Sequence, residues 1–459
     1  MSEETRQVDH AATAGWQRWL QVTPGEWRPL AISFLYFFFV LAAYYVIRPV
    51  REQLSAAVGS TQLPWFYAAT FIATLLLTPL FAWLAGRYPR RIMVPVVYLF
   101  FIGCLLAFVP LFTQSGLLSP RALGTLFFVW VSVFNLFVVS VFWSFMADVW
   151  DMAQARRLFP VIALGGTVGA ITGPLLTRLL ASVLGIAPLL VVSAGLLGAA
   201  LVCVILLGRW ASARQSANDP RSGAQREGAL GGSMLDGLKQ VLAHPFIRNM
   251  ALLLLLGDAI GTVNYALVAD YAGATFVGDN AAVLRTEFFA KVDLTTNVLQ
   301  IVAQLTLTRW LLVRFGAGPV IGVWAGAGLI MMLCVVFTQG SYAPVIGGLP
   351  WVVLGLIITR SLAYGMLGPA RESLFTMVSR ELRYKGKNAV DTAVWRFGDL
   401  VISLGMNGLR VFGVATAGFA AISAASAAIA GVVGFRLARQ VEDGVAESSS
   451  ASASVSVNS

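Results

Sequence analysis

The sequence predicts an all-α membrane protein with twelve transmembrane helices, and three observations support this fold class. Of the 459 residues, 58% are hydrophobic and only 12% are charged, about half the charged share of a soluble domain. Twelve apolar runs are long enough to cross a bilayer, whose hydrocarbon core of about 30 Å takes roughly 20 helical residues. The basic residues gather in alternate connections between those runs, as the topology of a multi-span protein requires.

The twelve runs divide into two sets of six. Most exceed 20 residues, so we expect helices that tilt or extend beyond the bilayer. The first set predicts an N-terminal six-helix bundle over residues 28–208, and the second a C-terminal bundle over residues 247–437. The predicted spans are 28–50, 62–85, 92–113, 121–149, 158–183, 186–208, 247–273, 284–312, 316–338, 345–373, 388–413 and 416–437.

Three polar segments flank or separate the bundles. Residues 1–27 begin with acidic rather than basic residues, so we expect no cleaved signal peptide and a cytoplasmic N-terminal segment. Residues 209–246 are rich in Ser, Gly and charge and end in an amphipathic stretch, which predicts a flexible cytoplasmic linker with a short surface helix. Residues 438–459 are low in complexity and too polar to pack, which predicts a disordered tail.

The net charge of +10 indicates topology rather than a nucleic-acid partner. With the N-terminus inside, the cytoplasmic connections hold nearly all the basic residues, and the opposite side holds little beyond Arg121 and Arg285. This bias predicts that both termini lie in the cytoplasm. We expect a multi-pass protein of the bacterial inner membrane. The partners we expect are the lipid bilayer and a small solute, with the protein functional as a monomer.

The residue types needed for several other functions are scarce. The cysteines are Cys104, Cys203 and Cys334, all within spans, and the histidines are His10 and His244, both outside them. Cysteine within a span behaves as a small apolar residue, so we expect neither a metal nor a cofactor. Gly386 and Lys387 precede Asn388 and not the Ser or Thr of a phosphate loop, and no nucleophile–base pair is visible. The sequence therefore predicts no enzyme.

Charged residues inside the spans carry the functional signal, because a charge near the bilayer centre costs about 3 kcal/mol or more. Arg48 and Arg51 share a helix face if Pro49 leaves the helix intact. They either extend to the outer interface or form a cationic pair that receives an anion. At the end of the fourth span, Asp148 or Asp151 paired with Arg156 or Arg157 would make a cytoplasmic lock.

In the second half, Arg360 lies deep in its span with no acidic residue one turn before it. Its partner must come from another helix or from a ligand, which makes it the strongest single candidate for substrate contact. Glu287 and Lys291 are four residues apart, so they either neutralise each other or take part in binding and coupling. Arg396 and Asp399 share a face and leave the same two alternatives open.

The candidate site residues fall into two groups. Those for substrate binding are Tyr45, Arg48, Arg51, Asn264, Tyr265, Lys291, Arg360, Tyr364 and Arg371. Those for ion coupling or gating are Asp148, Arg156, Arg157, Asp258, Glu287, Asp293, Glu372, Asp391, Arg396 and Asp399.

Six plus six spans with a long middle loop and both termini inside form the general plan of the major facilitator superfamily. The loop from Leu84 to Arg91, LAGRYPRR, resembles part of the arginine-rich motif of that superfamily. The stretch from Arg360 to Asp399 is similar to the ATP/ADP antiporter family, a divergent branch of it. The matching residues there are Arg360, Tyr364, Pro369, Arg371, Glu372, Lys385, Gly386, Lys387, Asp391, Arg396, Phe397 and Gly398, and those in the first half lie in 47–54, 142–145, 154–157 and 159–160.

The resemblance implies transport of nucleotides, but several of the family's charged positions are neutral here. The family's acidic position in the fourth span falls in Val131–Asn135, a lysine position is Ala363, and an Asp position is Gly368. The family's Trp-Lys pair is absent from Asn264–Phe276. Because desolvating a triphosphate without enough cations is very costly, these departures favour another organic anion or nucleotide-like solute over strict ATP/ADP exchange.

The sequence thus predicts a secondary active transporter or exchanger of an anionic organic solute, with a nucleotide among the candidates, that works by alternating access. The rival prediction is a membrane sensor or scaffold that keeps the transporter fold without moving a solute.

Overall fold

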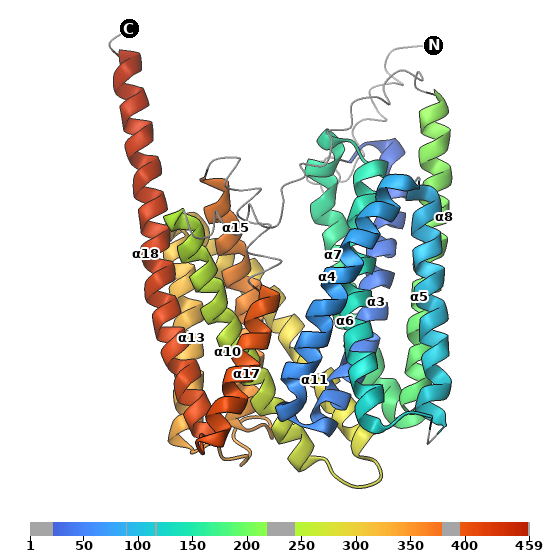
Figure 1. The fold of residues 1–459 in the computed structure, drawn as a ribbon. Helices are drawn as coiled ribbons and strands as arrows, with labels where there is room; N and C mark the ends of the chain where they lie inside the picture. Colours follow the sequence, from blue (N-terminus) through green and yellow to red (C-terminus); the bar gives the residue numbers. More distant parts are fainter. Residues whose placement is uncertain (1–21, 89, 115–116, 218–243, 379–394, 458–459) are drawn as a thin grey trace, which may run out of the picture. The chain divides into compact units, whose positions relative to one another are not determined.

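The computed structural model describes residues 22–88, 90–114, 117–217, 244–378 and 395–457, and these are almost entirely helical (Figure 1). The helices of the first half are α3 (Trp27–Val58), α4 (Leu63–Arg87), α5 (Arg90–Thr113), α6 (Pro120–Val149), α7 (Met152–Leu184) and α8 (Ile186–Ala217). Those of the second half are α10 (Pro245–Thr275), α11 (Ala281–Ala303), α12 (Arg309–Phe315), α13 (Ala317–Phe337), α14 (Trp351–Leu362), α15 (Gly368–Thr376), α17 (Trp395–Val411) and α18 (Thr416–Val457).

Eleven helices within the described residues are long and apolar enough to cross a membrane. The described part of the chain holds no β-strand, only one isolated bridge between Ile346 and Leu349. The predicted all-α membrane protein is therefore confirmed. The predicted span at 388–413 is seen in its second part, as α17, because residues 388–394 lie outside the described range.

Two predicted spans are not simple helices. The span at 284–312 becomes α11 and α12 joined by a π-helical turn, η4 (Gln304–Thr308), and the span at 345–373 becomes α14 and α15 joined by another, η5 (Ala363–Leu367). The helix of the predicted span at 345–373 also begins later than predicted, at Trp351. Gly347 and Gly348 have φ of 59° and 77°, which makes a tight turn, and Pro350 precedes the first helical residue.

The described helices group into two compact units by their internal contacts. Unit 1 comprises Met1–Arg48, Leu76–Leu118 and Trp130–Arg226, and unit 2 comprises Pro49–Leu75, Ser119–Val129 and Glu227–Ser459. Three long helices, α3, α4 and α6, therefore contribute residues to both units. The predicted bundles were divided by their order along the chain, whereas these units are divided by internal contacts. The bundle boundaries therefore remain a prediction.

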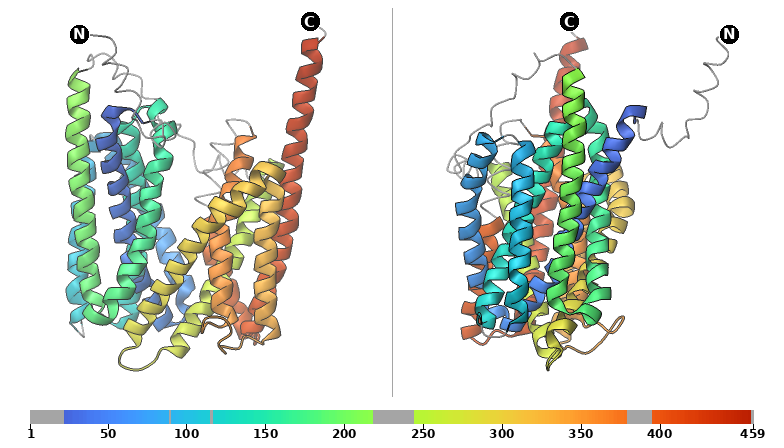
Figure 2. Two further views of the ribbon diagram at one scale, coloured as in Figure 1. Left: turned by 180° about the vertical axis from the view of Figure 1, so that it is seen from behind. Right: turned by 90° about the vertical axis from the view of Figure 1, so that its right-hand side faces the viewer.

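In unit 1, α7 packs against α3 through glycines. A Cβ atom on Gly173 would lie 2.6 Å from the Tyr45 Cβ, and Cβ atoms on Gly165 and Gly169 would collide with the carbonyl oxygens of Phe34 and Phe38. Small residues allow such close approach of membrane helices. The glycines of α7 therefore serve helix contact. In the same unit, α5 and α8 run alongside each other (Figure 2).

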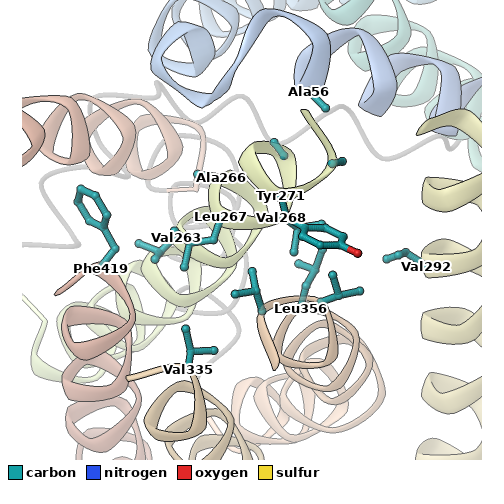
Figure 3. Packing of buried hydrophobic residues seen from close by; sticks show 14 of the residues in the cluster. Ala56, Val263, Ala266, Leu267, Val268, Tyr271, Val292, Val335, Leu356 and Phe419 are labelled. Atoms are coloured by element: carbon teal, nitrogen blue, oxygen red, sulfur yellow. The ribbon is translucent and has the colours of Figure 1, made fainter. Parts of the chain in front are cut away.

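In unit 2, the apolar core gathers around α10. Val263, Leu267 and Tyr271 of this helix pack against residues of the neighbouring helices, including Leu356 of α14 and Phe419 of α18 (Figure 3). Lipid is as apolar as this core, so close van der Waals packing rather than exclusion of water holds it together.

Residues 438–442, where the predicted disordered tail begins, lie within the described helix α18. The described helix α18 continues to Val457, and Glu442 accepts a hydrogen bond of 3.0 Å from the backbone N–H of Ala317. That N–H is one of the donors that the start of α13 leaves without a partner inside the helix. Composition alone misses a tail residue whose role is to cap another helix.

Candidate functional site

Arg360 of α14 finds its partner on another helix, as the sequence requires. Its guanidinium nitrogen Nη1 lies 3.5 Å from Oδ1 of Asp293 on α11. The Asp293 side chain is 3% exposed and that of Arg360 is 18% exposed. A distance of 3.5 Å makes this a loose ion pair, longer than the roughly 2.8 Å of a well-made charge-assisted hydrogen bond. An anion with better geometry can therefore compete with Asp293 for this guanidinium.

The residues on either side of Arg360 in α14 also bond polar groups of other helices. Thr359 accepts a hydrogen bond of 3.0 Å from the amide of Asn264, and Ser361 lies 3.1 Å from the carbonyl oxygen of Thr296. The side-chain oxygens of Asn264 and Thr296 are buried and have no hydrogen-bond partner among the described residues. Since buried polar atoms are nearly always bonded, these two oxygens are suited to a solute or water. Three successive residues of α14 thus face polar groups.

Tyr265 faces the end of α3 rather than α14. Its hydroxyl donates to Ser55 at 2.9 Å and lies within electrostatic reach of Glu52 and Arg51. Arg51 pairs with the neighbouring Glu52 and stacks on the ring of Phe128, with 4.8 Å between guanidinium carbon and ring centroid. Arg51 is therefore held within unit 2 by these two contacts.

A pair of aspartates lies where α10 meets α17. Asp399 accepts a hydrogen bond of 2.8 Å from Thr262. The carboxylate of Asp258 lies 2.5 Å from where a Cβ atom on Gly398 would be. The two aspartates are candidates for ion coupling, and the structure places both along the same helix contact. Asn264, Tyr265, Asp258 and the threonine all belong to α10, which makes this helix the main source of polar side chains in unit 2.

A further cluster, which sequence reasoning missed, lies at the end of α10. Asp270 accepts hydrogen bonds from the backbone N–H of Ser60 at 3.1 Å and from its hydroxyl at 2.7 Å. Arg410 of α17 donates to the same carboxylate at 3.0 Å, and Asn407 donates to the carbonyl oxygen of Thr61 at 2.7 Å. We call these five residues the Asp270 cluster. The available signal was Arg410 itself, a charge inside a predicted span.

Unit 1 holds the remaining N-terminal candidates. Arg48 is buried beside Tyr45, with 5.3 Å between its guanidinium carbon and the ring centroid. Arg157 binds both carboxylate oxygens of Glu26, which also accepts a hydrogen bond of 2.7 Å from Gln154. The sequence predicts an Asp near the end of the fourth span as the partner of Arg157. In the structure the partner is Glu26, which lies in the segment before α3.

Burial opposes the charge on Glu26, but its hydrogen bonds outweigh that effect. Burial alone would raise the pKa of this carboxyl group, whereas the hydrogen bonds from Arg157, from the Thr23 backbone and from Gln154 lower its pKa to about 2. Asp151 does not share in the pair through its hydrogen bonds; it caps α7 by accepting from the Gln154 backbone at 2.8 Å. Asp148 lies half-buried near the end of α6.

Several candidates are not brought to the Arg360 pair. Lys291 is exposed on α11, and no ion pair joins it to Glu287. Tyr364 is 45% exposed in η5. Arg371 and Glu372 bind each other at 3.2 Å. Asp391 lies outside the described residues, and of Arg156 and Arg396 the structure describes only the backbone, in α7 and α17.

The comparisons with known proteins identify the fold. No model of a known protein family matches the sequence, and no curated protein matches it significantly. Solved structures do match. The nucleoside transporter NupG is 16% identical, with a TM-score of 0.61, and the match covers 90% of this chain and 98% of that one.

Two further solved structures have the same fold. The transporter PepTSo of the POT family is 14% identical over 90% of this chain and 98% of its own, with a TM-score of 0.61. The xylose transporter XylE from E. coli is 14% identical over 88% of this chain and 94% of its own, with a TM-score of 0.57. The chain is thus a multi-pass membrane protein with a fold of the major facilitator type.

Proposed function

We propose that this protein is a secondary transporter or exchanger of a small anionic organic solute and that it works by alternating access. The observation that carries the proposal is the Arg360 pair, a loosely bound guanidinium placed in the apolar part of a membrane helix. Proteins of this fold that have been solved include transporters of nucleosides, peptides and sugars by their own descriptions. The fold supports transport, and Arg360 indicates the charge of the solute.

The energetics of the pair favour a functional role over a structural one. Two charges held in a membrane cost several kcal/mol of desolvation, and their mutual attraction often does no more than offset that cost. A well-packed apolar pair would stabilise the helices at least as well. Charged residues at such positions usually serve a solute or ion pathway, and here Asp293 partly neutralises Arg360.

The solute that fits is an anion with one or a few charges. Arg360 supplies a planar cation, and Asn264, which donates to the preceding residue Thr359, supplies a buried amide from α10. The ATP/ADP antiporter resemblance makes a nucleotide one candidate. Ala363 at a lysine position of that family lowers the local positive charge, which favours a monophosphate or another small anion over a triphosphate.

The remaining roles follow from the same proposal. Arg51, Tyr265 and Arg48 would line the solute path, and Asp258 and Asp399 would couple ion movement to it. The proposed location is a bacterial inner membrane with both termini in the cytoplasm, and the proposed functional form is a monomer.

Counterflow in proteoliposomes tests the proposal. Vesicles are loaded with one unlabelled anion and exposed to the same anion in labelled form, using AMP, ADP, ATP and a dicarboxylate in turn. The variant is Arg360→Ala, and the matched control is Arg178→Ala, which removes an exposed arginine of α7. We expect wild type and the control to take up at least one of these anions and Arg360→Ala to lose the uptake. Equal uptake by all three proteins would contradict the role of Arg360.

A further inference from the structure

The Asp270 cluster joins parts of the chain that are far apart in sequence. Ser60 and Thr61 lie in the connection between α3 and α4, whereas Asp270 lies near the end of α10 and Arg410 near the end of α17. The connection belongs to the first six spans, and the two helices belong to the last six. All of these residues are members of unit 2, so the contacts lie within one compact body.

The bonds of the cluster are mutually dependent. The Ser60 hydroxyl donates to Asp270 and accepts from Arg410, so one hydroxyl bridges the carboxylate and the guanidinium. Arg410 also donates to the side-chain oxygen of Asn407 at 3.1 Å, and Asn407 in turn donates to the carbonyl oxygen of Thr61. Each residue orients the next, and the loss of one member therefore weakens the others.

The exposure of the cluster distinguishes it from the buried pairs of the site. The side chains of Asp270 and Arg410 are 35% and 22% exposed. Both groups can be hydrated when the bonds break, so breaking them leaves no charge stranded in an apolar core. An ion pair with these properties is suited to repeated opening and closing.

Beside the cluster, the end of α3 packs against α10. Ala56 is 3% exposed and belongs to the apolar core around α10 (Figure 3). A Cβ atom on Gly273 would lie 2.8 Å from the Ala56 carbonyl oxygen, so the two backbones touch. Because Ala56 lies just before the connection that holds Ser60, this contact persists only while that connection stays in place.

We propose that the Asp270 cluster is the latch that closes the extracytoplasmic side of the protein, and this proposal rests on the proposed transport function. Positive-inside topology places the α3–α4 connection on the extracytoplasmic side. In alternating access the two six-span halves part on one side and then on the other. The α3–α4 connection must then leave α10 and α17, and the bonds of Ser60, Asp270 and Arg410 break and reform once in each cycle.

Thiol accessibility tests the latch without any knowledge of the solute. Ala56→Cys is introduced into a protein in which Cys104, Cys203 and Cys334 are replaced by serine or alanine, and purified protein is labelled with a hydrophilic maleimide. Asp270→Asn, Arg410→Gln and Ser60→Ala are then added one at a time. We expect each to raise the labelling rate about three- to tenfold, the range that loss of an exposed ion pair and its hydrogen bonds produces.

Two exposed charges provide matched controls. Asp279→Asn and Arg121→Gln remove a carboxylate and a guanidinium that make no contact within the cluster, and both should leave the labelling rate unchanged. The double variant Asp270→Asn with Arg410→Gln should label no faster than the faster single variant, because both changes break one network. Additive effects of the two changes would mean two separate structural roles.

The outcomes separate this proposal from the proposed function. Labelling that stays at the wild-type rate in all three latch variants overturns the latch, as does an increase that the Asp279 control shares. Gel filtration of each variant shows whether it is folded, and Ser60→Ala, the mildest change, keeps the test decisive if the charge variants fail. A faster-labelling variant in a protein that moves none of the anions tested would support the latch and count against the anionic solute.

Discussion

The Thr308 hydroxyl donates a hydrogen bond of 2.8 Å to the carbonyl oxygen of Gly365, and this bond joins the π-helical turns of two membrane helices. A π turn leaves backbone groups without their regular helical partners, and such turns are frequent at functional sites. Here η5 follows Arg360 by two residues and contains Tyr364. The bond therefore fixes the turn that sets the direction of the helix beyond the candidate site.

Loss of this bond should destabilise the protein. Thr308→Val keeps the side-chain shape but removes the hydroxyl, which should lower the free energy of unfolding by about 1 kcal/mol. Thr308→Ser keeps the hydroxyl and serves as the control. Thermal unfolding in detergent is the measurement. Equal unfolding temperatures for the two variants would show that the Gly365 carbonyl does not need this donor.

The contact between α3 and α7 predicts a strict size limit at Gly169. Gly169→Val places a side chain against the Phe38 carbonyl oxygen and should lower stability by about 1–3 kcal/mol, since overpacked helices must shift apart. Gly195→Val on α8 is the matched control, because no atom lies within 4 Å of its Cβ position. Thermal unfolding of both variants in detergent is the measurement. Equal unfolding temperatures for Gly169→Val and Gly195→Val would contradict this packing.

The Glu26–Arg157 pair predicts a loss of stability in acid. The pKa of Glu26 is lowered from 4.5 to about 2, so the folded state favours the charged carboxylate. The stabilisation is complete above about pH 4.5 and disappears as the pH falls from there to about 2. Allowing for screening by solvent, it amounts to roughly 1–2 kcal/mol.

Unfolding temperatures measured between pH 6 and pH 2 would show this loss in wild type. Glu26→Gln has no carboxyl group to titrate at this position, so its curve should change less over the same interval. The prediction fails if the difference between the two proteins is constant from pH 6 to pH 2.

The effects of Arg360 and Asp293 substitutions on the free energy of unfolding should not add. Arg360→Ala leaves a nearly buried carboxylate with less compensation, which should cost about 3 kcal/mol or more. Adding Asp293→Asn removes that charge and should restore much of the lost stability. Thermal unfolding of the wild type, both single variants and the double variant gives the coupling free energy. Independent effects of the two changes would mean that the pair does not interact.

The sequence predicts the membrane fold well because lipid imposes a simple rule of length and polarity on each span. It also singles out Arg360 and Asp293, since a charge in an apolar run is conspicuous. It does not predict that the two residues pair, because no spacing rule links residues on helices α14 and α11. The partner of Arg157 was missed for the same reason, since Glu26 lies outside any span and 131 residues away.

Polar contacts that need backbone geometry are also beyond sequence patterns. Nothing in the run from Ala281 to Phe315 marks where the π turn falls, because π and α turns use the same residue types. The Asp270 cluster depends on a backbone N–H of Ser60 and a backbone carbonyl of Thr61, which every residue possesses. Such sites become visible only when the helix ends are placed side by side.

The cap of α13 by Glu442 predicts that the first turn beyond residue 438 supports the fold. A chain that ends at Val441 loses this carboxylate, whereas one that ends at Glu447 keeps it and differs from full length only in the distal tail. The first should be less stable by about 0.5–2 kcal/mol, the usual value of a helix N-terminal cap, since the carboxylate also interacts favourably with the positive end of the helix dipole. Glu442→Ala in the full chain should reproduce the loss. Equal stability of the two shortened chains would show that the Ala317 N–H is satisfied equally well by water.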